Sequence, residues 1–407
     1  MKRRDWREPK QQVKVISINR LLFALAPLLV IAPLLVIGVL GGCSSELSVD
    51  ELRFNDIQVL GSHNSYKRAM DMELFATLSR SNPGLAQSLD YAHIPLEEQL
   101  NLGVRALELD IYHDPEGGLY AQPLGLSMVG SATEYDVEGL MLQPGLKVLH
   151  AQDIDFRSNC PTFAGCLSRL KQWSDQNPGH LPIMVSINAK DDVIDQPGFV
   201  VPHKFEGTAW DALDAELRDG LGDKLILPAE IKGDADNVNA AITDSGWPEL
   251  TVMMNRFLFV LDESEEKNAD YLNGRKNAVL FPNMPEGHPD SAVRIVNRPI
   301  EDMELIKALV GQGYLVRTRA DANTQEARSG DTRRRDAAWS SGAQFVSTDY
   351  YQVDVRFESG YSVSMPKIEL SSERAPKLAD RSFHCNPVAA GSRCARIKLK
   401  EELSKIE

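Results

Sequence analysis

Short apolar runs alternate with longer amphipathic stretches along most of this 407-residue chain. The apolar runs predict strands, and apolar residues that recur at helical spacing between them predict helices. The expected strands lie at residues 57–61, 104–112, 147–150, 181–188, 224–227, 257–262, 278–282, 314–319 and 344–349. The expected helices lie at residues 69–78, 89–102, 163–177, 210–221, 237–245, 303–310 and 325–340. Residues 115–145 contain several Gly and Pro and are expected to form a long loop.

About eight strands that alternate with helices predict a parallel sheet. In a chain of this length the pattern favours an α/β fold of the (β/α)8 TIM-barrel type, regular or distorted. An open doubly wound sheet is the alternative, but no glycine-rich phosphate loop follows the first expected strand. We expect the barrel to span residues 51–365, and residues 366–407 to form a C-terminal extension with a short amphipathic helix at 398–406.

The N-terminus has the pattern of an export signal. Seven basic residues precede residues 21–40, a run without any charge. This run is long enough to cross a bilayer, so a retained transmembrane anchor is the alternative. The segment Leu40-Gly41-Gly42-Cys43 resembles the lipobox of bacterial lipoproteins, which predicts a signal peptide at 1–42, a lipidated Cys43 and a linker at 43–50. Because Ser rather than Asp follows Cys43, the chain resembles lipoproteins sorted to the outer membrane, or the cell surface, of a Gram-negative bacterium.

Charge and cysteine usage agree with an exported protein. The first 42 residues hold seven of the 44 basic and two of the 58 acidic residues, so the remainder carries a formal net charge of −19. Such an acidic surface argues against nucleic-acid binding, and it leaves the acyl anchor as the expected contact with a membrane. Cys160 and Cys166 lie close in sequence, as do Cys385 and Cys394, which predicts two local disulfides. A four-Cys zinc site is less suitable because no CxxC spacing is present.

Polar residues that could carry chemistry follow the ends of the expected strands. Alternation puts Glu108 and Asp110 on one face of the strand at 104–112, and two neighbouring carboxylates repel each other unless a cation or proton lies between them. Asn188 and Lys190 share a face in the same way. The full set is His63, Asn64, Glu108, Asp110, His150, Asn188, Lys190, Arg317, Arg319, Asp321 and Asp349.

These residue types suit a calcium-assisted phosphoryl transfer. Oxygen ligands bind a hard cation that offsets charge on a phosphate, and two imidazoles can move the protons. A zinc hydrolase would need a tight ligand motif such as HExxH, and none is present.

Six segments together resemble a known family, the calcium-dependent phosphatidylinositol-specific phospholipase C-like phosphodiesterases of bacteria. They are GSHNSY at 61–66, RALELDIY at 105–112, LHAQDIDFRSNC at 149–160, HLPIMVSINAKDD at 180–192, VRTRADA at 316–322 and SGAQFVSTDYY at 341–351. The resemblance implies a barrel fold, a calcium cofactor with Asn64, Glu108 and Asp110 as ligands, and His63 and His150 as the catalytic acid–base pair. It implies attack of the inositol 2-hydroxyl on its own phosphodiester, with release of diacylglycerol. Which His is the base stays open.

The chain departs from that family at one position. Related phospholipases usually have a calcium-ligating Glu where this chain has Asn188, whose carbonyl can ligate but adds no charge. Asp153 or Asp155 could supply the missing charge.

The remaining polar residues have two readings. We expect Lys190, Arg317, Arg319 and Asp349 to bind substrate. As alternatives, Lys190, Asp153 and Asp155 would form ordinary ion pairs at the barrel mouth, and the two arginines would pair with Glu108 or Asp349 as scaffold. His180, Tyr350 and Tyr351 are expected to be structural, and His93, His113, His203, His288 and His384 have no motif context.

The function predicted is cleavage of a phospholipid or small phosphodiester by a membrane-anchored enzyme. A glycerophosphodiester phosphodiesterase, in which water attacks, is the alternative among enzymes. A non-catalytic ligand-binding lipoprotein is the alternative outside them, although it would have no need of two titrating imidazoles.

Overall fold

The structure is a computed structural model that describes residues 52–129, 134–366, 382–386 and 388–389. The expected signal peptide, Cys43 and the linker lie outside this part of the chain, and so do Cys394 and the expected helix at 398–406. In the described part, no helix combines the length and the apolar character that a bilayer span requires.

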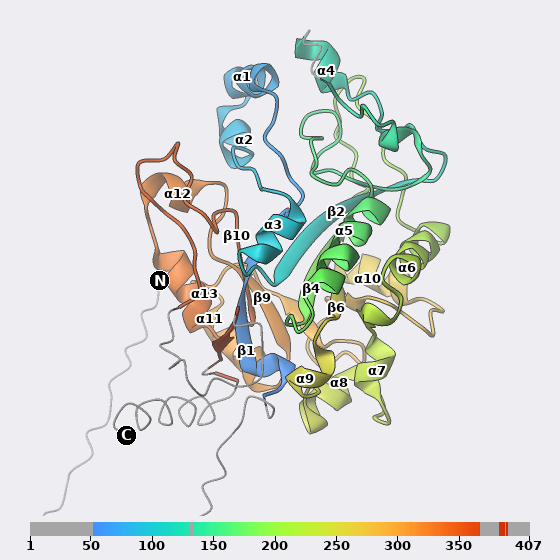
Figure 1. The fold of residues 1–407 in the computed structure, drawn as a ribbon, viewed down its shortest axis with the longest axis vertical. Helices are drawn as coiled ribbons and strands as arrows, with labels where there is room; N and C mark the ends of the chain where they lie inside the picture. The colour runs from blue at the N-terminus through green and yellow to red at the C-terminus, as the bar shows by residue number, and fades with distance from the viewer. Residues whose placement is uncertain (1–51, 130–133, 367–381, 387, 390–407) are drawn as a thin grey trace, which may run out of the picture. The chain divides into compact units, whose positions relative to one another are not determined.

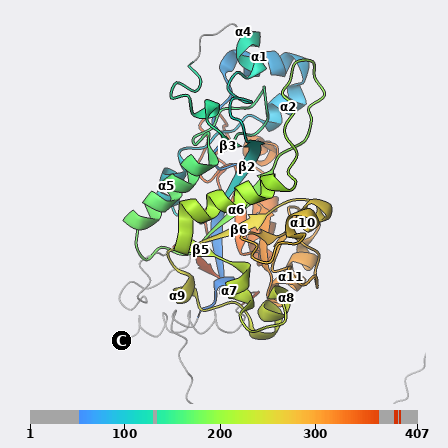
Figure 2. The same ribbon diagram turned by 90° about the vertical axis from the view of Figure 1, so that its right-hand side faces the viewer.

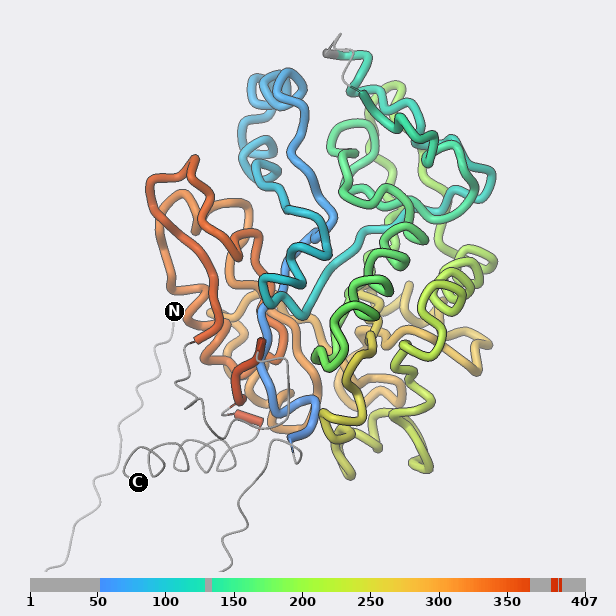
Figure 3. Tube along the Cα trace, in the orientation of Figure 1, coloured from blue at the N-terminus to red at the C-terminus, as the bar shows by residue number. Residues whose placement is uncertain are grey.

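The strands form a curled, mostly parallel sheet with the order β5-β6-β4-β2-β1-β10-β9-β8 (Figure 1). The first strand in sequence lies between the second and the last parallel strand, as closure into a barrel requires. In Figure 3 the blue segment that carries β1 accordingly runs beside the orange segment of β10. The parallel strands are β1 (Ile57–Ser62), β2 (Ala106–Asp114), β4 (Ile183–Ala189), β5 (Leu225–Ile226), β6 (Phe257–Leu261), β7 (Phe281–Pro282), β8 (Val293–Ile295), β9 (Leu315–Arg319) and β10 (Phe345–Thr348). The predicted α/β barrel is therefore confirmed.

The barrel is distorted between β7 and β8. Among the described residues no backbone ladder joins these two strands, and side chains bridge them instead. Asn283 Oδ1 accepts a hydrogen bond from the Ile295 amide at 3.2 Å, and Arg294 Nη1 donates to the Met284 carbonyl at 2.7 Å. The short strand β8 was not expected from the sequence.

Alternate residues of the central strands contribute to two separate apolar clusters. Ile183, Val185 and Ile187 of β4 belong to the larger cluster, which includes residues of the helices α5 and α6, whereas Met184 belongs to the second cluster. The same alternation puts Leu107, Leu109 and Ile111 of β2 on the helix side. Glu108, Asp110 and Asn188 therefore point to the interior of the barrel, as predicted.

Gly61 allows β1 to lie close to both of its neighbours. A Cβ atom on Gly61 would lie 2.9 Å from the Ala106 Cβ and 3.0 Å from Ser347 Oγ. Any larger side chain would push the strands apart just before His63, and thus glycine is required here.

The helices cover the outside of the sheet and extend past the strand ends. They are α1 (Met72–Ser81), α2 (Pro83–Ser88), α3 (Leu96–Asn101), α4 (Leu124–Val129), α5 (Phe163–Gln176), α6 (Thr208–Leu221), α7 (Pro228–Lys232), α8 (Val238–Ala240), α9 (Leu250–Met253), α10 (Glu265–Leu272), α11 (Met303–Gly311), α12 (Gln325–Ser329) and α13 (Arg333–Ser340). Figure 2 shows α5 and α6 side by side against the sheet. The sheet side of α5 is apolar, and Thr162 Oγ1 caps the helix by accepting from the Gly165 amide at 3.2 Å.

Several predicted elements need correction. The expected strand at 147–150 is β3 (Gly145–Val148), and it runs antiparallel to β2, with Ile111 opposite Val148. It is therefore a hairpin partner of β2 rather than a barrel strand, and His150 lies in the turn after it. The expected helix at 325–340 is divided into α12 and α13 because Gly330 adopts a φ of +73°. The expected loop at 115–145 contains α4.

One disulfide and part of the C-terminal extension are visible. Cys160 and Cys166 form the predicted disulfide. His384–Cys385 form the strand β11, which pairs antiparallel with β1. The predicted pairing of Cys385 involves Cys394, outside the described residues, and stays a prediction.

Candidate active site

The polar residues singled out in the sequence gather where β1, β2, β4, β9 and β10 end. Asp110 lies directly opposite Asn188 in the ladder between β2 and β4. In the ladder between β9 and β10, Arg319 lies opposite Ser347, two residues before Asp349. The C-terminal ends of barrel strands are where such folds assemble their active sites.

His63 is held in one orientation by a carboxylate and a guanidinium. Its Nδ1 lies 2.8 Å from Asp349 Oδ1, and Arg319 Nη1 donates to its Nε2 at 2.9 Å. Because arginine can only donate, Nε2 is the acceptor and the proton is on Nδ1. His63 is thus a neutral imidazole with a lone pair on Nε2, and 17% of its side chain remains exposed.

Burial and charge explain the proton affinities around His63. Burial lowers the pKa of His63, and the Arg319 guanidinium acts in the same direction. Burial alone would raise the pKa of Asp349, but Arg319 and His63 hold it well below its ordinary value. Burial and the charge of Asp349 raise the pKa of the neighbouring Asp321 to about 7. The site therefore keeps Asp349 ionised and His63 able to accept a proton.

His150 is bound by a second carboxylate. Its Nδ1 lies 2.8 Å from Asp155 Oδ2, within a turn closed by a bridge between Ala151 and Asp155. Asp155 is fully buried and also lies 3.3 Å from the buried Lys67 Nζ. Burial would raise the pKa of Asp155, but Lys67 and His150 lower it overall. The His150 side chain is 20% exposed, so its Nε2 edge is the part available to a ligand.

Glu108 lies at the centre of the site. Its Oε1 accepts from Asn188 Nδ2 at 3.0 Å and lies 3.8 Å from His63 Nε2, while its Oε2 accepts from Arg317 Nη2. Burial would raise the pKa of Glu108, but the Arg317 guanidinium lowers it overall. Nearby, burial raises the pKa of Asp262 to about 6, with its Oδ2 4.0 Å from Arg317 Nη1.

The other predicted metal ligands adjoin Glu108. Asp110 Oδ2 lies 3.5 Å from Lys190 Nζ, and the charge of Asp110 raises the pKa of Lys190. Asn64 has a left-handed backbone, with a φ of +46°, and its Nδ2 donates to Tyr91 Oη at 2.7 Å. The amide nitrogen is occupied in this way, so Oδ1 is the atom that Asn64 offers to a cation.

Both arginines of β9 form ion pairs with site carboxylates, Arg317 with Glu108 and Arg319 with Asp349. These are the structural pairs considered above as the alternative to substrate binding. Arg317 is fully buried, and besides Glu108 it bonds Ser347 Oγ and Asn297 Oδ1, each at 3.0 Å. Arg319 Nη2 donates to Asp349 Oδ2 at 2.9 Å. Asp349 thus contacts His63 and Arg319.

Asp153 and Asp155 were considered as sources of the charge that Asn188 lacks as a metal ligand. Their contacts lie elsewhere. Asp153 accepts from the backbone amides of Leu124 and Val200 at 2.8 and 2.7 Å, and Asp155 is paired with His150 and Lys67. Their contacts are with the loops and with the second imidazole.

Sequence reasoning missed three residues that support the two imidazoles. His93 Nε2 donates to the His63 carbonyl at 2.7 Å, and its ring stacks on Tyr351. Burial lowers the pKa of His93 to about 4, so the ring is neutral. Tyr91 bonds Asn64, and Lys67 bonds Asp155. No motif marked these residues, since His93 and Tyr91 come from a loop about 30 positions beyond β1. Lys67 directly follows GSHNSY and gave the one available signal.

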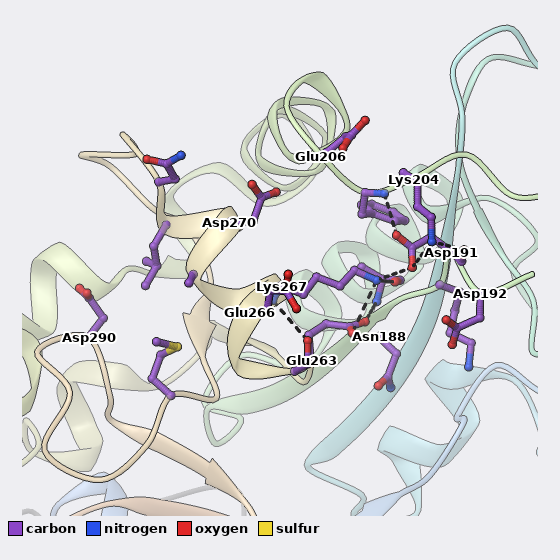
Figure 4. Close-up of a pocket in the computed structure, with 18 of the residues that line it drawn as sticks. Asn188, Asp191, Asp192, Lys204, Glu206, Glu263, Glu266, Lys267, Asp270 and Asp290 are labelled. Atoms are coloured by element: carbon purple, nitrogen blue, oxygen red, sulfur yellow. Dashed lines mark hydrogen bonds and ion pairs between the residues drawn. The ribbon is translucent and has the colours of Figure 1, made fainter.

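A polar pocket of about 1200 Å³ adjoins the site on the side of β4 and β6 (Figure 4). Asn188, Lys190, Glu263 and Lys267 are among the residues that line this pocket. Lys267 Nζ binds Asp191 Oδ1 at 2.9 Å. The lining is rich in acids, so the pocket suits a hydroxyl-rich or cationic group better than acyl chains.

Comparison with known proteins identifies the family. The family model described as phosphoinositide phospholipase C, Ca2+-dependent, matches residues 52–374. The chain belongs to this family. The predicted family, the predicted enzyme class (a phospholipase C-type phosphodiesterase) and calcium as the cofactor of the family are confirmed. No curated protein matches the chain.

Solved structures of low identity are similar to this one. A calcium-dependent phosphoinositol-specific phospholipase C from a Gram-negative Pseudomonas species is 17% identical, with 77% of this chain and 95% of that chain covered and a TM-score of 0.48. A Ca2+-dependent phosphatidylinositol-specific phospholipase C from Streptomyces antibioticus is 19% identical, with 74% and 95% covered and a TM-score of 0.46. The phosphatidylinositol-specific phospholipase C from Listeria monocytogenes is 12% identical, with 74% and 89% covered and a TM-score of 0.42.

The donor chemistry at the end of β2 fits calcium. Glu108, Asp110, Asn64 and Asn188 offer oxygen atoms only, which is the preference of a hard cation. Among the described residues, no three His, Cys, Asp or Glu side chains converge as a metal site, since two of these four candidates are amides. Both carboxylates have cationic partners. Arg317 is fixed by buried contacts, whereas Lys190 is one-third exposed and can move away.

Proposed function

We propose that this phospholipase C cleaves the phosphodiester of phosphatidylinositol on its glycerol side, with His63 as general base and His150 as general acid. The observation that carries the assignment is the difference in the contacts of the two imidazoles. Both have a carboxylate at Nδ1, but His63 also receives a hydrogen bond from a guanidinium on Nε2. His63 Nε2 therefore has a lone pair that can accept a proton, and His150 is left to give one to the leaving oxygen.

Two protons move in the proposed reaction. The inositol 2-hydroxyl gives its proton to His63 Nε2 as its oxygen bonds to phosphorus, and Asp349 stabilises the imidazolium that results. The bond between phosphorus and the glycerol oxygen breaks, and His150 gives its Nε2 proton to that oxygen. The products are diacylglycerol and a cyclic inositol phosphate. Arg319 leaves Nε2 when the hydroxyl arrives, and its donors then bind a phosphate oxygen.

Calcium, held by Glu108, Asp110, Asn64 and Asn188, would supply positive charge against the phosphate. The chain's own part is to orient the oxygens. Asn188 Nδ2 donates a hydrogen bond to Glu108 Oε1. A half-turn of that amide would present its carbonyl oxygen to the cation instead. Lys190, drawn off Asp110, is then free for the substrate.

We also propose that the enzyme acts from a membrane anchor. The support is the lipobox-like segment before Cys43 and the uncharged run at 21–40. Lipidation at Cys43 would hold the barrel at the outer membrane or cell surface, within reach of a lipid substrate.

Phosphorus NMR of the full-length protein in mixed micelles tests the proposal. With phosphatidylinositol and calcium we expect a cyclic inositol phosphate signal, and chelation with EDTA should abolish it. Parallel samples contain glycerophosphoinositol. Turnover of that diester alone, without a cyclic product, would replace our proposal by a glycerophosphodiesterase. Calcium binding without turnover of either compound would refute this head group, and the absence of both would favour a non-catalytic protein.

A further inference from the structure

Lys67 is a buried ammonium whose donors are all directed at fixed acceptors. The side chain has no exposed surface. Its Nζ donates to the carbonyls of Tyr91 and Leu89 at 2.8 and 3.0 Å and lies 3.3 Å from Asp155 Oδ2. It also lies 4.6 Å from the centre of the Tyr91 ring. A charge held in this way by backbone carbonyls is fixed in position.

Lys67 and His150 share one oxygen of Asp155. His150 Nδ1 lies 2.8 Å from the same Oδ2 that faces Lys67, whereas Oδ1 is buried without a hydrogen-bond partner in the described part of the chain. The two cations therefore compete for the negative charge of a single atom. The part of the negative charge of Asp155 that Lys67 neutralises cannot stabilise a protonated His150.

We propose that Lys67 is a positioning residue for the reaction: it fixes Asp155 against His150 and makes His150 a stronger acid toward the leaving oxygen. A lone Asp155 would bind the imidazolium so tightly that the proton would be released slowly. With Lys67 present the orientation is kept, and part of the electrostatic attraction is removed. The role of Lys67 rests on the proposed function of His150.

The other titratable groups around His150 do not replace this effect. Tyr112 Oη donates to the His150 carbonyl at 3.2 Å, and Tyr66 is buried beside Asp155. Burial raises the pKa of both phenols well above the ordinary value, so both stay neutral. Asp110 is paired with Lys190. Among the described residues, Lys67 is the only lysine or arginine that pairs with Asp155.

Removing the ammonium should move the titration of His150. Lys67 Nζ lies at most about 6 Å from His150 Nδ1 through the shared oxygen, and at an effective dielectric constant of about 20 a unit charge at that distance shifts a titration midpoint by about two pH units. In Lys67→Met we expect the midpoint of the His150 imidazole to rise by about two pH units. The alkaline limb of the pH–rate profile should move to higher pH by a similar amount. The value of kcat should fall at least tenfold, while KM changes little. In Lys67→Arg the charge remains, so the midpoint should stay near that of the wild type.

The experiment is an NMR titration of the full-length protein labelled in histidine, run beside the pH–rate profile. The signal that disappears in His150→Gln assigns His150. Lys147→Met is the matched control because Lys147 is another fully buried lysine, paired at 3.3 Å with Asp114. It should lower stability and leave the His150 midpoint in place. A midpoint that is unmoved or lowered in folded Lys67→Met would overturn the proposal.

Two further comparisons keep the test decisive. If Lys67→Met does not fold, Asp155→Asn is compared with the double variant Lys67→Met/Asp155→Asn, in which no buried carboxylate is left unpaired. Loss of the ammonium should raise the His150 midpoint in that background too, and no rise would refute the proposal. Because the NMR midpoint needs no turnover, a raised midpoint in a protein that cleaves no phosphatidylinositol would support the Lys67–His150 coupling and refute the proposed function.

Discussion

At the scale of single residues, the two imidazoles of the site have the same type of partner but different surroundings. Each is bonded through Nδ1 to a buried carboxylate, Asp349 for His63 and Asp155 for His150. Arg319 contacts the Nε2 of His63 directly, whereas Lys67 reaches His150 only through Asp155. The hydrogen bond from Arg319 fixes the lone pair of His63 on Nε2. This asymmetry is why we propose His63 as the base and His150 as the acid, a choice that the sequence left open.

A substrate with a good leaving group tests that assignment. An inositol phosphodiester of 4-nitrophenol needs little help from an acid because its leaving oxygen is weakly basic. We expect His150→Ala to lose about 10²–10⁴-fold in kcat on the lipid but less than tenfold on the nitrophenyl ester. His63→Ala should lose a similar 10²–10⁴-fold on both substrates. Absorbance at the nitrophenolate band gives the rates. If the nitrophenyl ester rescued His63→Ala instead of His150→Ala, the two roles would be exchanged.

Asn188 is the residue at which this chain departs from its family, and its contact with Glu108 gives a test without turnover. Asn188→Glu would put a carboxylate beside Glu108, where the amide now donates at 3.0 Å. We expect the variant to melt several degrees below the wild type in EDTA and to gain more from calcium, because a cation between two carboxylates relieves their repulsion. Differential scanning calorimetry measures both shifts.

Asn188→Gln, which keeps the neutral amide, is the control for this experiment. It should show no enlarged calcium effect. A calcium response in Asn188→Glu equal to that of the wild type would mean that position 188 does not face the cation.

At the scale of helices and strands, prediction succeeded where the pattern had one solution. The alternation in β2 put Glu108 and Asp110 opposite Leu107 and Leu109, and the two apolar clusters of the barrel agree with it. The strand at 147–150 was found, but a short apolar run is compatible with parallel or antiparallel pairing. Its pairing as a hairpin with β2 depends on the long connection at 115–145, whose course no local pattern determines.

Elements without a clear periodic pattern were missed. The helix α10 has only Asn268 and Tyr271 buried, so its sequence shows little apolar spacing. The strand β8 has only three residues, too few for a pattern. The split of the expected helix at 325–340 depends on Gly330, whose effect on a helix cannot be separated in sequence from a tolerated interior glycine.

At the scale of the whole molecule, strand order explains which site residues sequence could find. Because parallel strands deliver their carboxyl ends to one edge, His63, Glu108, Asn188 and Asp349 could be placed together without coordinates. The partners within that set could not be predicted, since they depend on strand neighbours. Arg317 reaches Glu108 across the barrel interior. Lys67 and Asp155 come from loops after β1 and β3, and nothing in either loop alone indicates the other.

The pH dependence of global stability can be predicted from Glu263, which lies in the polar pocket beside the site. Burial raises its pKa to about 7, although Lys267 and the Ala189 amide oppose the change. The folded protein therefore holds a proton that the unfolded chain has lost, and stability falls as the pH rises from about 4.5 through 7. The expected loss for this group is roughly 3 kcal/mol.

Glu263→Gln should remove this part of the profile. Urea unfolding between pH 4.5 and 8 measures it as the difference between wild type and variant, which should grow with pH in favour of the variant and level off above pH 7. Glu266→Gln is the control because Glu266 is exposed in the first turn of α10, close in sequence to Glu263. Its profile should run parallel to that of the wild type. A difference that stays constant with pH would show that Glu263 is ionised in the folded protein at acidic pH. In that case Lys267 would keep Glu263 ionised in spite of burial. The pocket would then carry more negative charge beside the catalytic site.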